Sequence, residues 1–471
     1  MTGSSAPAEC GSSQNVARKS DLAETPPGAI VIGGNYRALG LVRSLGRRGI
    51  RTWLMREPTD ALASVSRYVQ RNLVWPGGSD QQKVASLLDV QSKYDLKKWA
   101  IFPTEDESAR ILAQNWEMLD GAFTLTVPQW SVLRWAYDKR LTYSLARDVG
   151  CPCPQTTCPA SRQELAAMAC DFPAVLKPAF RAGANGSQAP KAWLVTDRAS
   201  LLARYDEACA FFPADALVVQ ELIPGSGNTQ FSFAALMYEG CPLASLVAKR
   251  IRQMPMDFGK FSTYVETASE SAVVQSSIAL LKAIRFTGLV EVEYKFDARD
   301  GHFKLLDINP RIWGWHTLSA RAGIDFPYLL WRMVHGQDIP QVLAQAGVRW
   351  IWPSMDLTVG LREIVRRRLS VGAYMKSVRP PIENAIFASD DLLPGLLELP
   401  LLSYKLARRA FSKPGPIVYE PYRGATDSAT VAASNSAAAA LLSSIPNPAP
   451  STSPDSNVLM ASAIDSPDPS T

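Results

Sequence analysis

The segment 288–311 reads GLVEVEYKFDARDGHFKLLDINPR, and the rest of the architecture can be worked out from it. Two runs of alternating apolar and polar residues flank an Asp-Gly turn, a pattern typical of a β-hairpin. Alternate side chains of a strand point to the same face of a sheet. The polar side chains on these faces are Glu291 and Glu293 on the first strand and Asp307, Asn309 and Arg311 on the second.

The opposite face of this predicted hairpin is apolar, with Val290, Val292, Leu306 and Ile308. One face can therefore pack in a core while the other is free for chemistry, although an exposed charged sheet face is the simpler alternative. Carboxylate and amide oxygens are the ligands that Mg²⁺ prefers, and Mg²⁺ in turn bridges phosphates. If the two strands align in register, they form a metal site.

The hairpin resembles the signature of the ATP-grasp superfamily, in which two acids and an asparagine bind magnesium. The resemblance implies Glu293, Asp307 and Asn309 as ligands of Mg²⁺, with Mn²⁺ as an alternative, and Arg311 as a catalytic contact to substrate or acyl phosphate. Asp307 departs from the family pattern, which often has Glu there. Its shorter side chain puts the geometry of a second metal in doubt.

Other segments resemble ATP-grasp elements in the family's order, over roughly residues 130–335. Lys139, in Tyr-Asp-Lys, and Lys177, which ends an apolar strand, resemble the two lysines that reach ATP phosphates. Gly183 and Gly186 resemble the glycine-rich loop that closes over the phosphates; plain loop flexibility is the alternative. The strand at 218–225 resembles the hinge that binds adenine, which assigns Glu221 and Leu222 to the nucleotide.

A narrower resemblance lies in the basic segment 249–259. With the Asn-Pro-Arg-Ile-Trp-Gly that follows the hairpin, it is similar to D-aspartate-ligase-like ATP-grasp proteins. Strand alternation predicts that Arg250 and Arg252 share a face, with Lys249 on the other. Since Arg binds carboxylates in a bidentate manner, Arg252 is the candidate catalytic contact to substrate or acyl phosphate. A solvated basic strand is the alternative.

The resemblance and the composition together predict an α/β and α+β architecture. A doubly wound pre-ATP-grasp α/β domain precedes a two-lobed ATP-grasp domain, and both ends of the chain are polar and poor in core residues. The predicted divisions are a disordered segment 1–27, the α/β domain 28–125, the ATP-grasp domain 126–340, a helical C-terminal appendage 341–415 and a disordered tail 416–471.

Several other classes of protein are disfavoured by the sequence. The turn at 33–40 does not fit the G-x-G-x-x-G dinucleotide motif, and Gly259-Lys260 lacks the remainder of a Walker P-loop. Cys151, Cys153 and Cys158 lack a second ligand pair for zinc. The net charge of +5 is too diffuse to indicate nucleic-acid binding, and no apolar run suits stable membrane insertion. The first 27 residues lack the apolar centre of a signal peptide, which favours a cytoplasmic location.

The predicted function is that of a carboxylate–amine ligase, which uses ATP to activate a carboxylate as an acyl phosphate before an amine displaces phosphate. The resemblance implies small-molecule carboxylate and amine substrates, among them amino acids, and is compatible with a homodimer. Two alternatives stay open. One is another ATP-grasp reaction, such as carbamoyl phosphate or bicarbonate chemistry, and the other is a non-catalytic nucleotide-binding regulatory protein.

Overall fold

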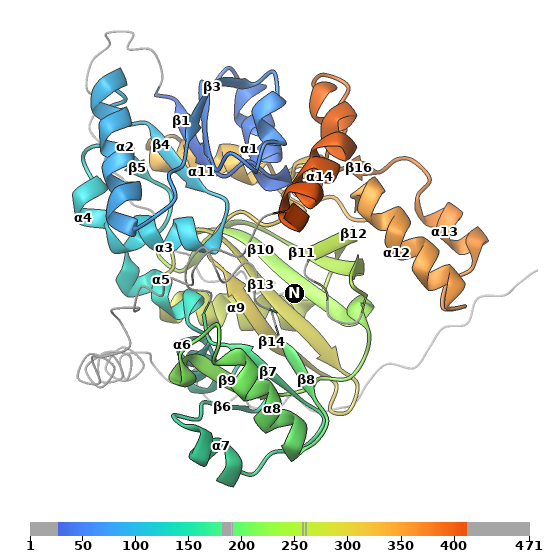
Figure 1. Cartoon of the computed structure of the whole chain (residues 1–471). Coiled ribbons are helices and arrows are strands. Elements are labelled where there is room, and N and C mark those ends of the chain that lie inside the picture. The colour runs from blue at the N-terminus through green and yellow to red at the C-terminus, as the bar shows by residue number, and fades with distance from the viewer. Residues whose placement is uncertain (1–26, 181–189, 191, 257–258, 260, 412–471) are drawn as a thin grey trace, which may run out of the picture. The chain divides into compact units, whose positions relative to one another are not determined.

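A computed structural model describes residues 27–180, 190, 192–256, 259 and 261–411 of the chain. These residues form three β-sheets, covered by helices and joined by loops (Figure 1). The predicted disordered segments, apart from residue 27, lie outside the described residues, as do Gly183 and Gly186.

The first sheet is parallel, with the strand order β3-β2-β1-β4-β5, and belongs to the predicted doubly wound unit. Ile30 of β1 packs in the core that contains α2 and α3, while Val31 packs in the core that contains α1. The elements are β1 (Ala29–Ile32), α1 (Tyr36–Gly46), β2 (Thr52–Arg56), β3 (Val69–Val74), α2 (Asp80–Tyr94), β4 (Ala100–Pro103), α3 (Asp106–Gln114), α4 (Trp116–Leu119) and β5 (Thr124–Leu125).

The turn after β1 requires glycine at position 33. Gly33 has a φ of +125°, and a Cβ atom there would lie 2.0 Å from Oγ1 of Thr104 at the end of the neighbouring strand. Asn35 then caps α1, because its side chain accepts a hydrogen bond from the amide of Arg37. The turn therefore brings the start of α1 to the carboxyl ends of β1 and β4, the edge where open α/β sheets bind ligands.

The second sheet has four strands in the order β6-β9-β7-β8 and packs against helices α7 and α8. Helices α5 and α6 lead into it from the first domain. The elements are α5 (Trp130–Tyr137), α6 (Lys139–Asp148), β6 (Thr156–Thr157), α7 (Arg162–Ala167), β7 (Ala174–Pro178), β8 (Trp193–Val195), α8 (Arg198–Ala208) and β9 (Leu217–Glu221).

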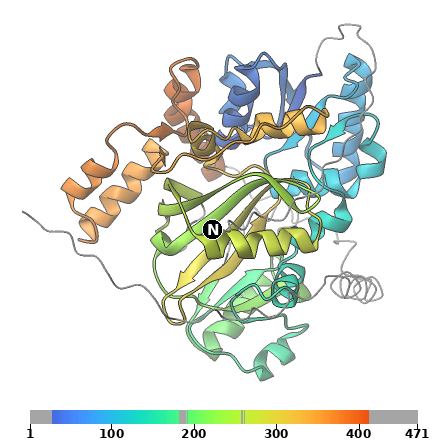
Figure 2. The same cartoon turned by 180° about the vertical axis from the view of Figure 1, so that it is seen from behind.

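The third sheet has seven strands in the order β14-β13-β10-β11-β12-β15-β16, and the predicted hairpin forms its β13–β14 edge. Helix α9 lies along the sheet (Figure 2). The elements are β10 (Gln230–Tyr238), β11 (Cys241–Met254), β12 (Phe261–Ala268), α9 (Ser271–Ala283), β13 (Gly288–Asp297), β14 (His302–Asn309), α10 (His316–Arg321) and α11 (Phe326–Val334).

The segment 341–415, expected to be a helical appendage, also contributes to this sheet. Strands β15 (Arg349–Ile351) and β16 (Glu383–Asn384) extend it beyond β12. The helices here are α12 (Pro353–Val365), α13 (Val371–Ser377) and α14 (Leu393–Phe411). Asp391, just before α14, accepts a hydrogen bond from the buried Arg43 of α1 at 2.9 Å, which ties this segment to the first domain. Among the described residues, no helix is both long and apolar enough to cross a bilayer.

Candidate active site

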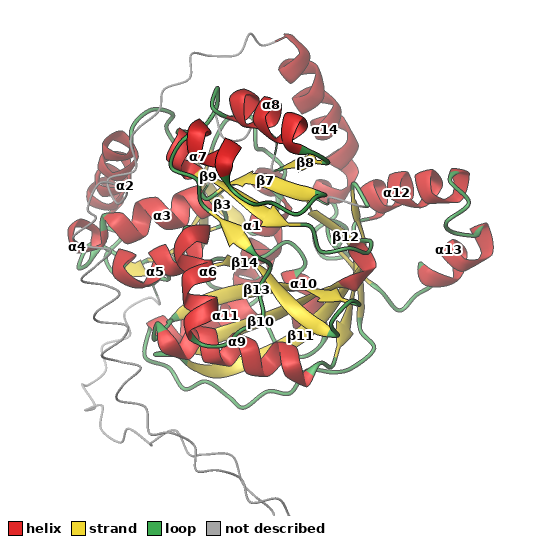
Figure 3. Cartoon of the chain, turned by 90° about the horizontal axis from the view of Figure 1, so that it is seen from below, coloured by secondary structure: helices red, strands yellow, loops and turns green. Residues whose placement is uncertain are grey.

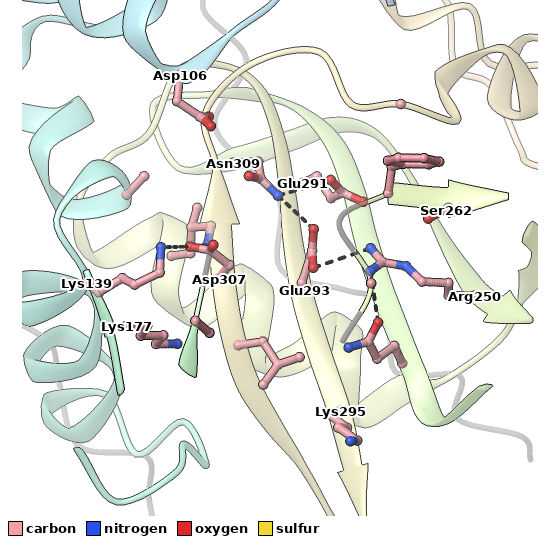
Figure 4. A pocket seen from close by; sticks show the side chains of 18 of the residues that line it. Asp106, Lys139, Lys177, Arg250, Ser262, Glu291, Glu293, Lys295, Asp307 and Asn309 are labelled. Atoms are coloured by element: carbon pink, nitrogen blue, oxygen red, sulfur yellow. Dashed lines mark hydrogen bonds and ion pairs between the residues drawn. The ribbon is translucent and has the colours of Figure 1, made fainter. Parts of the chain in front are cut away.

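The two strands of the β13–β14 hairpin pair so that the predicted polar side chains lie together, but the expectation that Leu306 lies on the core face is wrong. The pairing shifts register beyond the Glu293–Asp307 pair, so that Leu305 packs in the core and Leu306 lines the cavity. Glu291 lies opposite Asn309 and Glu293 lies opposite Asp307 in the antiparallel pairing of β13 with β14. The Asn309 amide nitrogen donates hydrogen bonds to Glu291 Oε2 at 3.1 Å and to Glu293 Oε1 at 3.0 Å (Figure 4). Val292 and Ile308, on the opposite face, are buried in the core. The polar face therefore converges on one point because its reverse face is held in the core.

This polar face lines a cavity of about 560 Å³ between the three sheets. Residues from the first domain, the four-stranded sheet and the C-terminal segment complete the lining, among them Asn35, Lys177 and Trp352. The predicted site residues that line the cavity are Lys139, Lys177, Glu221, Leu222, Glu293, Asp307, Asn309 and Arg311. The fold thus gathers predicted site residues that are up to 172 positions apart, from Lys139 to Arg311.

Two lysines line the cavity on the side of Asp307 (Figure 4). Lys139, the first residue of α6, donates a hydrogen bond from Nζ to Asp307 Oδ1 at 2.8 Å. Lys177 of β7 donates from Nζ to the hydroxyl of Tyr143 at 2.9 Å. Burial, reinforced by the charge of Lys139, lowers the pKa of Lys177 to about 7. An anionic ligand between these lysines would relieve their repulsion, which suits a polyphosphate.

Arg311 links the hairpin to the first domain. Its Nε lies 2.8 Å from Oδ1 of Asp106 at the start of α3, and its Nη2 donates to Asn309 Oδ1 at 3.0 Å. Burial favours the neutral acid, but the charge of Arg311 prevails and lowers the pKa of Asp106 to about 2. Close by, Arg37 of α1 pairs with Glu105 at 2.8 Å. The wall from the first domain is therefore made of paired charges.

Glu291 is a buried acid that the sequence placed on this face without giving it a role. The indole nitrogen of Trp315 donates to its Oε1 at 2.9 Å. Burial and the neighbouring carboxylate of Glu293 raise the pKa of Glu291. Trp315 thus orients this carboxyl group.

The adenine-binding candidate lies at the end of β9. The side chain of Glu221 pairs with Arg299 and lies 3.6 Å from Lys304 Nζ. Lys295 Nζ donates to the carbonyl oxygens of Ile223 at 2.9 Å and Gly225 at 2.7 Å, and thereby fixes the segment after the strand. Sequence reasoning missed Lys295, although the alternation of Glu291, Glu293 and Lys295 along β13 places all three on one face.

Arg252 does not line the cavity, and the expectation that it shares a face with Arg250 is wrong. The pairing of β11 with β12 shifts register between these residues, so that Arg250 lies opposite Val265 and Arg252 opposite Tyr264. Such a β-bulge re-aims the side chains that follow it. Arg250 lines the cavity, where its Nη2 lies 3.3 Å from Glu293 Oε2. Arg250 Nη1 also donates to the side chain of Gln230 at 2.9 Å.

Arg252 instead forms a buried, bidentate ion pair with Asp356 of α12. Its Nε and Nη2 donate to the two carboxylate oxygens at 2.9 and 2.8 Å, and Nη1 donates to the Ser377 hydroxyl at 3.1 Å. Asp356 is fully buried, and Arg252 is 5% exposed. This geometry suits a structural anchor for α12 and α13.

The donor chemistry of the hairpin fits a magnesium ion that shares its coordination with a phosphate ligand. Among the described residues, no three His, Cys, Asp or Glu side chains form a metal-binding group. Glu293 and Asp307 would offer two carboxylates to such an ion and Asn309 an amide oxygen, and further oxygens would come from the bound ligand. Mg²⁺ is commonly held by one or two carboxylates plus substrate phosphates. The Asn309 amide would have to turn by half a rotation to present its oxygen, because its nitrogen now faces the glutamates.

Comparison with known proteins finds similar sequences around the β13–β14 hairpin and similar folds over most of the described chain. A family model described as "ATP-grasp in the biosynthetic pathway with Ter operon" matches residues 241–352, which contain the hairpin. A D-aspartate ligase from Enterococcus faecium (strain Aus0004) is 24% identical over 237 residues, which is 46% of this chain and 53% of that protein. The chain thus spans about half the length of this curated relative.

Solved structures share the fold at low sequence identity. An L-amino acid ligase from Bacillus licheniformis is 15% identical with a TM-score of 0.53, and the match covers 66% of this chain and 75% of that one. A biotin carboxylase–ATP complex from Campylobacter jejuni is 15% identical with a TM-score of 0.55, over 68% of this chain and 74% of that one. The predicted architecture, an α/β domain followed by the two-lobed domain, is confirmed.

Proposed function

We propose, from the ATP-grasp fold of this chain, that it is an ATP-dependent ligase that joins a small carboxylate to an amine with release of ADP and phosphate. The observation that carries the proposal is the cross-strand set of Glu293, Asp307 and Asn309, which shares one cavity with three lysines and three arginines. Such a site holds positive charge where phosphoryl transfer develops negative charge.

Glu293, Asp307 and Asn309 would hold Mg²⁺, or Mn²⁺ in its place. A bound divalent ion neutralises phosphate charge and orients the terminal phosphate. Lys139 and Lys177 would contact the phosphates as point charges. Glu221 and Leu222 would meet adenine at the end of β9, where the side chain of Glu221 is already paired, so that the backbone is the part left for the base.

The chemistry begins with a substrate carboxylate, which is already a nucleophile. Its oxygen attacks the γ-phosphorus of ATP, a new P–O bond forms, the bond to ADP breaks, and an acyl phosphate results. The amine then attacks the acyl carbon, the C–O bond to phosphate breaks, and the nitrogen loses a proton. Arg311 and Arg250 lie on the cavity wall beside the metal-ligand candidates, where they would hold the transferred phosphoryl group.

Arg250 takes the role that the sequence assigned to Arg252. A guanidinium group must reach the reacting atoms to stabilise their charge, and Arg252 is engaged by Asp356 outside the cavity. Arg250 lies on the cavity side of the bulge, 3.3 Å from Glu293. We therefore propose Arg311 and Arg250 as the catalytic pair.

The class of substrate is supported by the likeness to a D-aspartate ligase and to an L-amino acid ligase. We propose that the carboxylate or the amine partner is an amino acid. The cavity wall suits a molecule that carries both charges, because it offers acids at Glu105 and Asp106 and bases at Arg37 and Arg311.

The test is to incubate the protein with Mg·ATP, hydroxylamine and pools of amino acids and small carboxylates. Hydroxylamine captures an acyl phosphate as a hydroxamate, which mass spectrometry identifies. A hydroxamate that depends on one carboxylate supports the proposal and names that substrate. ADP release that requires bicarbonate, without any hydroxamate, would assign the chain to carboxylation or carbamoyl chemistry. ATP binding without turnover in any pool would favour a regulatory binder.

A further inference from the structure

Helices α12 and α13 form a hairpin that extends away from the seven-stranded sheet (Figure 3). The outward side of α12 carries Leu357, Leu361 and Val365, whose spacing of four residues places them on one stripe of the helix. Their side chains are 50%, 54% and 82% exposed. On α13, Val371 and Met375 have the same spacing and are also exposed. Exposed apolar stripes of this kind mark interaction surfaces.

The hairpin is also strongly basic. Between residues 353 and 379 the chain has six basic and two acidic residues, a net charge of 6 − 2 = +4. The basic residues are Arg362, Arg366, Arg367, Arg368, Lys376 and Arg379. The two acids are internal: Asp356 is neutralised by Arg252, and Glu363 is 6% exposed. On α12 itself, Arg362 follows Leu361 of the apolar stripe, and Arg366, Arg367 and Arg368 come directly after the helix, so basic side chains lie beside the stripe and at its end.

The hairpin is held in a fixed orientation. The Arg252–Asp356 pair fastens α12 to β11, and Arg252 also donates to Ser377 at the end of α13. The two helices approach closely where Gly360 faces Tyr374, since a Cβ atom on that glycine would lie 2.3 Å from the ring. The apolar stripe therefore faces outward because the opposite side of α12 is anchored, which makes its exposure a property of the fold.

We propose that the α12–α13 hairpin is a docking surface for membranes that contain anionic lipids. A helix that lies in a membrane interface has an apolar stripe for the acyl boundary and Lys or Arg beside it for the headgroups. The apolar stripe of α12 and the arginines within and directly after this helix provide both features, and the net charge of +4 complements an anionic surface. A second copy of the chain suits the hairpin less well, because two such basic surfaces would repel each other. The proposal rests on the surface of the fold and is independent of the proposed ligase activity.

The experiment is co-sedimentation of the full chain with vesicles of phosphatidylcholine alone or mixed with phosphatidylglycerol. The chain should bind the mixed vesicles and not the neutral ones, and salt should weaken the binding. A triple variant with Arg366→Gln, Arg367→Gln and Arg368→Gln should lower the partition coefficient about a hundredfold, because each basic side chain near an anionic surface contributes about fivefold. A second variant, Leu361→Gln with Val365→Gln, tests the apolar stripe and should also lose binding.

Matched controls separate the hairpin from general surface effects. Val74→Gln with Met118→Gln removes two exposed apolar side chains elsewhere, and Arg162→Gln with Arg204→Gln removes two exposed charges; both should bind as the original chain does. Because every changed side chain is exposed, ATP affinity should be unaltered in all variants. Thermal unfolding should also be unaltered except in the triple arginine variant, where Arg366 and Arg368, which lie 3.5 and 3.9 Å from the buried Glu363, are removed. Absence of vesicle binding, or binding that survives both hairpin variants, would overturn the proposal. The proposal would also be overturned if the original chain formed a dimer but bound no vesicles, and the Leu361→Gln, Val365→Gln variant lost that dimer. The apolar stripe would then serve self-association.

Discussion

Replacing Asp356 by Asn tests whether Arg252 is an anchor, as the structure indicates, or a catalytic residue, as its sequence context suggested. The change keeps the size of the side chain but removes its charge, and leaves the guanidinium of Arg252 buried with 5% of its surface exposed. Removal of one partner from a buried ion pair costs about 3–5 kcal/mol. Since Asn still offers an oxygen to Arg252 and to Thr263, which donates to Asp356 at 2.9 Å, the lower end of about 3 kcal/mol is expected.

The assay is hydrogen exchange of the backbone amides in α12 and α13, which depend on this anchor. A loss of about 3 kcal/mol in the free energy of local opening increases the exchange rate about a hundredfold, because about 1.4 kcal/mol corresponds to a factor of ten. Asp206→Asn is the control, since Asp206 pairs with Arg162 at 2.8 Å on the surface and both side chains are half exposed. Exchange in this control should match the original chain.

A double variant completes this test. Arg252→Met with Asp356→Leu replaces the ion pair by apolar side chains and should restore much of the lost protection, because no buried charge is left without a partner. Unchanged protection in Asp356→Asn would refute the anchor. If Arg252→Met abolished ATP-dependent turnover while the hydrogen-exchange protection of α12 stayed intact, Arg252 would have a catalytic role.

Three further predictions concern the cavity and the interface beside it. With its pKa lowered to about 7, Lys177 is mostly neutral at pH 8 in the absence of ATP. Because a nearby phosphate raises the pKa of a lysine, ATP binding at pH 8 should be accompanied by uptake of nearly one proton. Calorimetry in buffers of different ionisation enthalpy measures that uptake; it should vanish in Lys177→Met, and no uptake by the original chain would contradict the assignment. Arg250→Met should lower kcat/KM for ADP release roughly ten- to a hundredfold, as expected for loss of a charge-assisted contact, whereas a change below about twofold would exclude a catalytic role. Gly40→Ala should destabilise the fold by about 1–3 kcal/mol in thermal unfolding, since the added Cβ would lie 2.5 Å from His316 Nε2. Gly372→Ala is the control and should leave stability unchanged, because a Cβ there would have no atom within 4 Å. Equal destabilisation by the two changes would contradict the packing account.

The polar face of the β13–β14 hairpin was predictable from sequence up to the register shift after Glu293, because its register there follows from local rules; the placement of Leu306 was not. Alternation fixes which side chains of β13 and β14 share a face, and the apolar positions of the other face hold that arrangement in the core. The same rule explains why Lys295 was within reach of sequence reasoning. The candidate ligands Glu293, Asp307 and Asn309 needed only this register and the family resemblance to be grouped.

The bulge between Arg250 and Arg252 could not be predicted in the same way. Alternation assumes one residue on each strand per register step, and an extra residue in β11 breaks that assumption without a signal in composition. The C-terminal contributions were equally hidden. Trp352 reaches the cavity and Asp391 reaches α1 only because the chain returns to the first two domains after residue 341, and such long-range contacts leave no periodic pattern.

The central claim is that the β13–β14 hairpin holds the metal that serves ATP, and the most direct test is Mg²⁺-dependent ADP release in Asn309→Ala and Glu293→Gln. The substrate pool found active by hydroxamate trapping would be used, with Arg162→Gln as a surface control and thermal unfolding as a check on the fold. The account predicts that Asn309→Ala and Glu293→Gln each lower Mg²⁺-dependent ADP release by at least about a hundredfold, while the Arg162→Gln control retains it. Undiminished ADP release with the same Mg²⁺ dependence in both hairpin variants would contradict the claim.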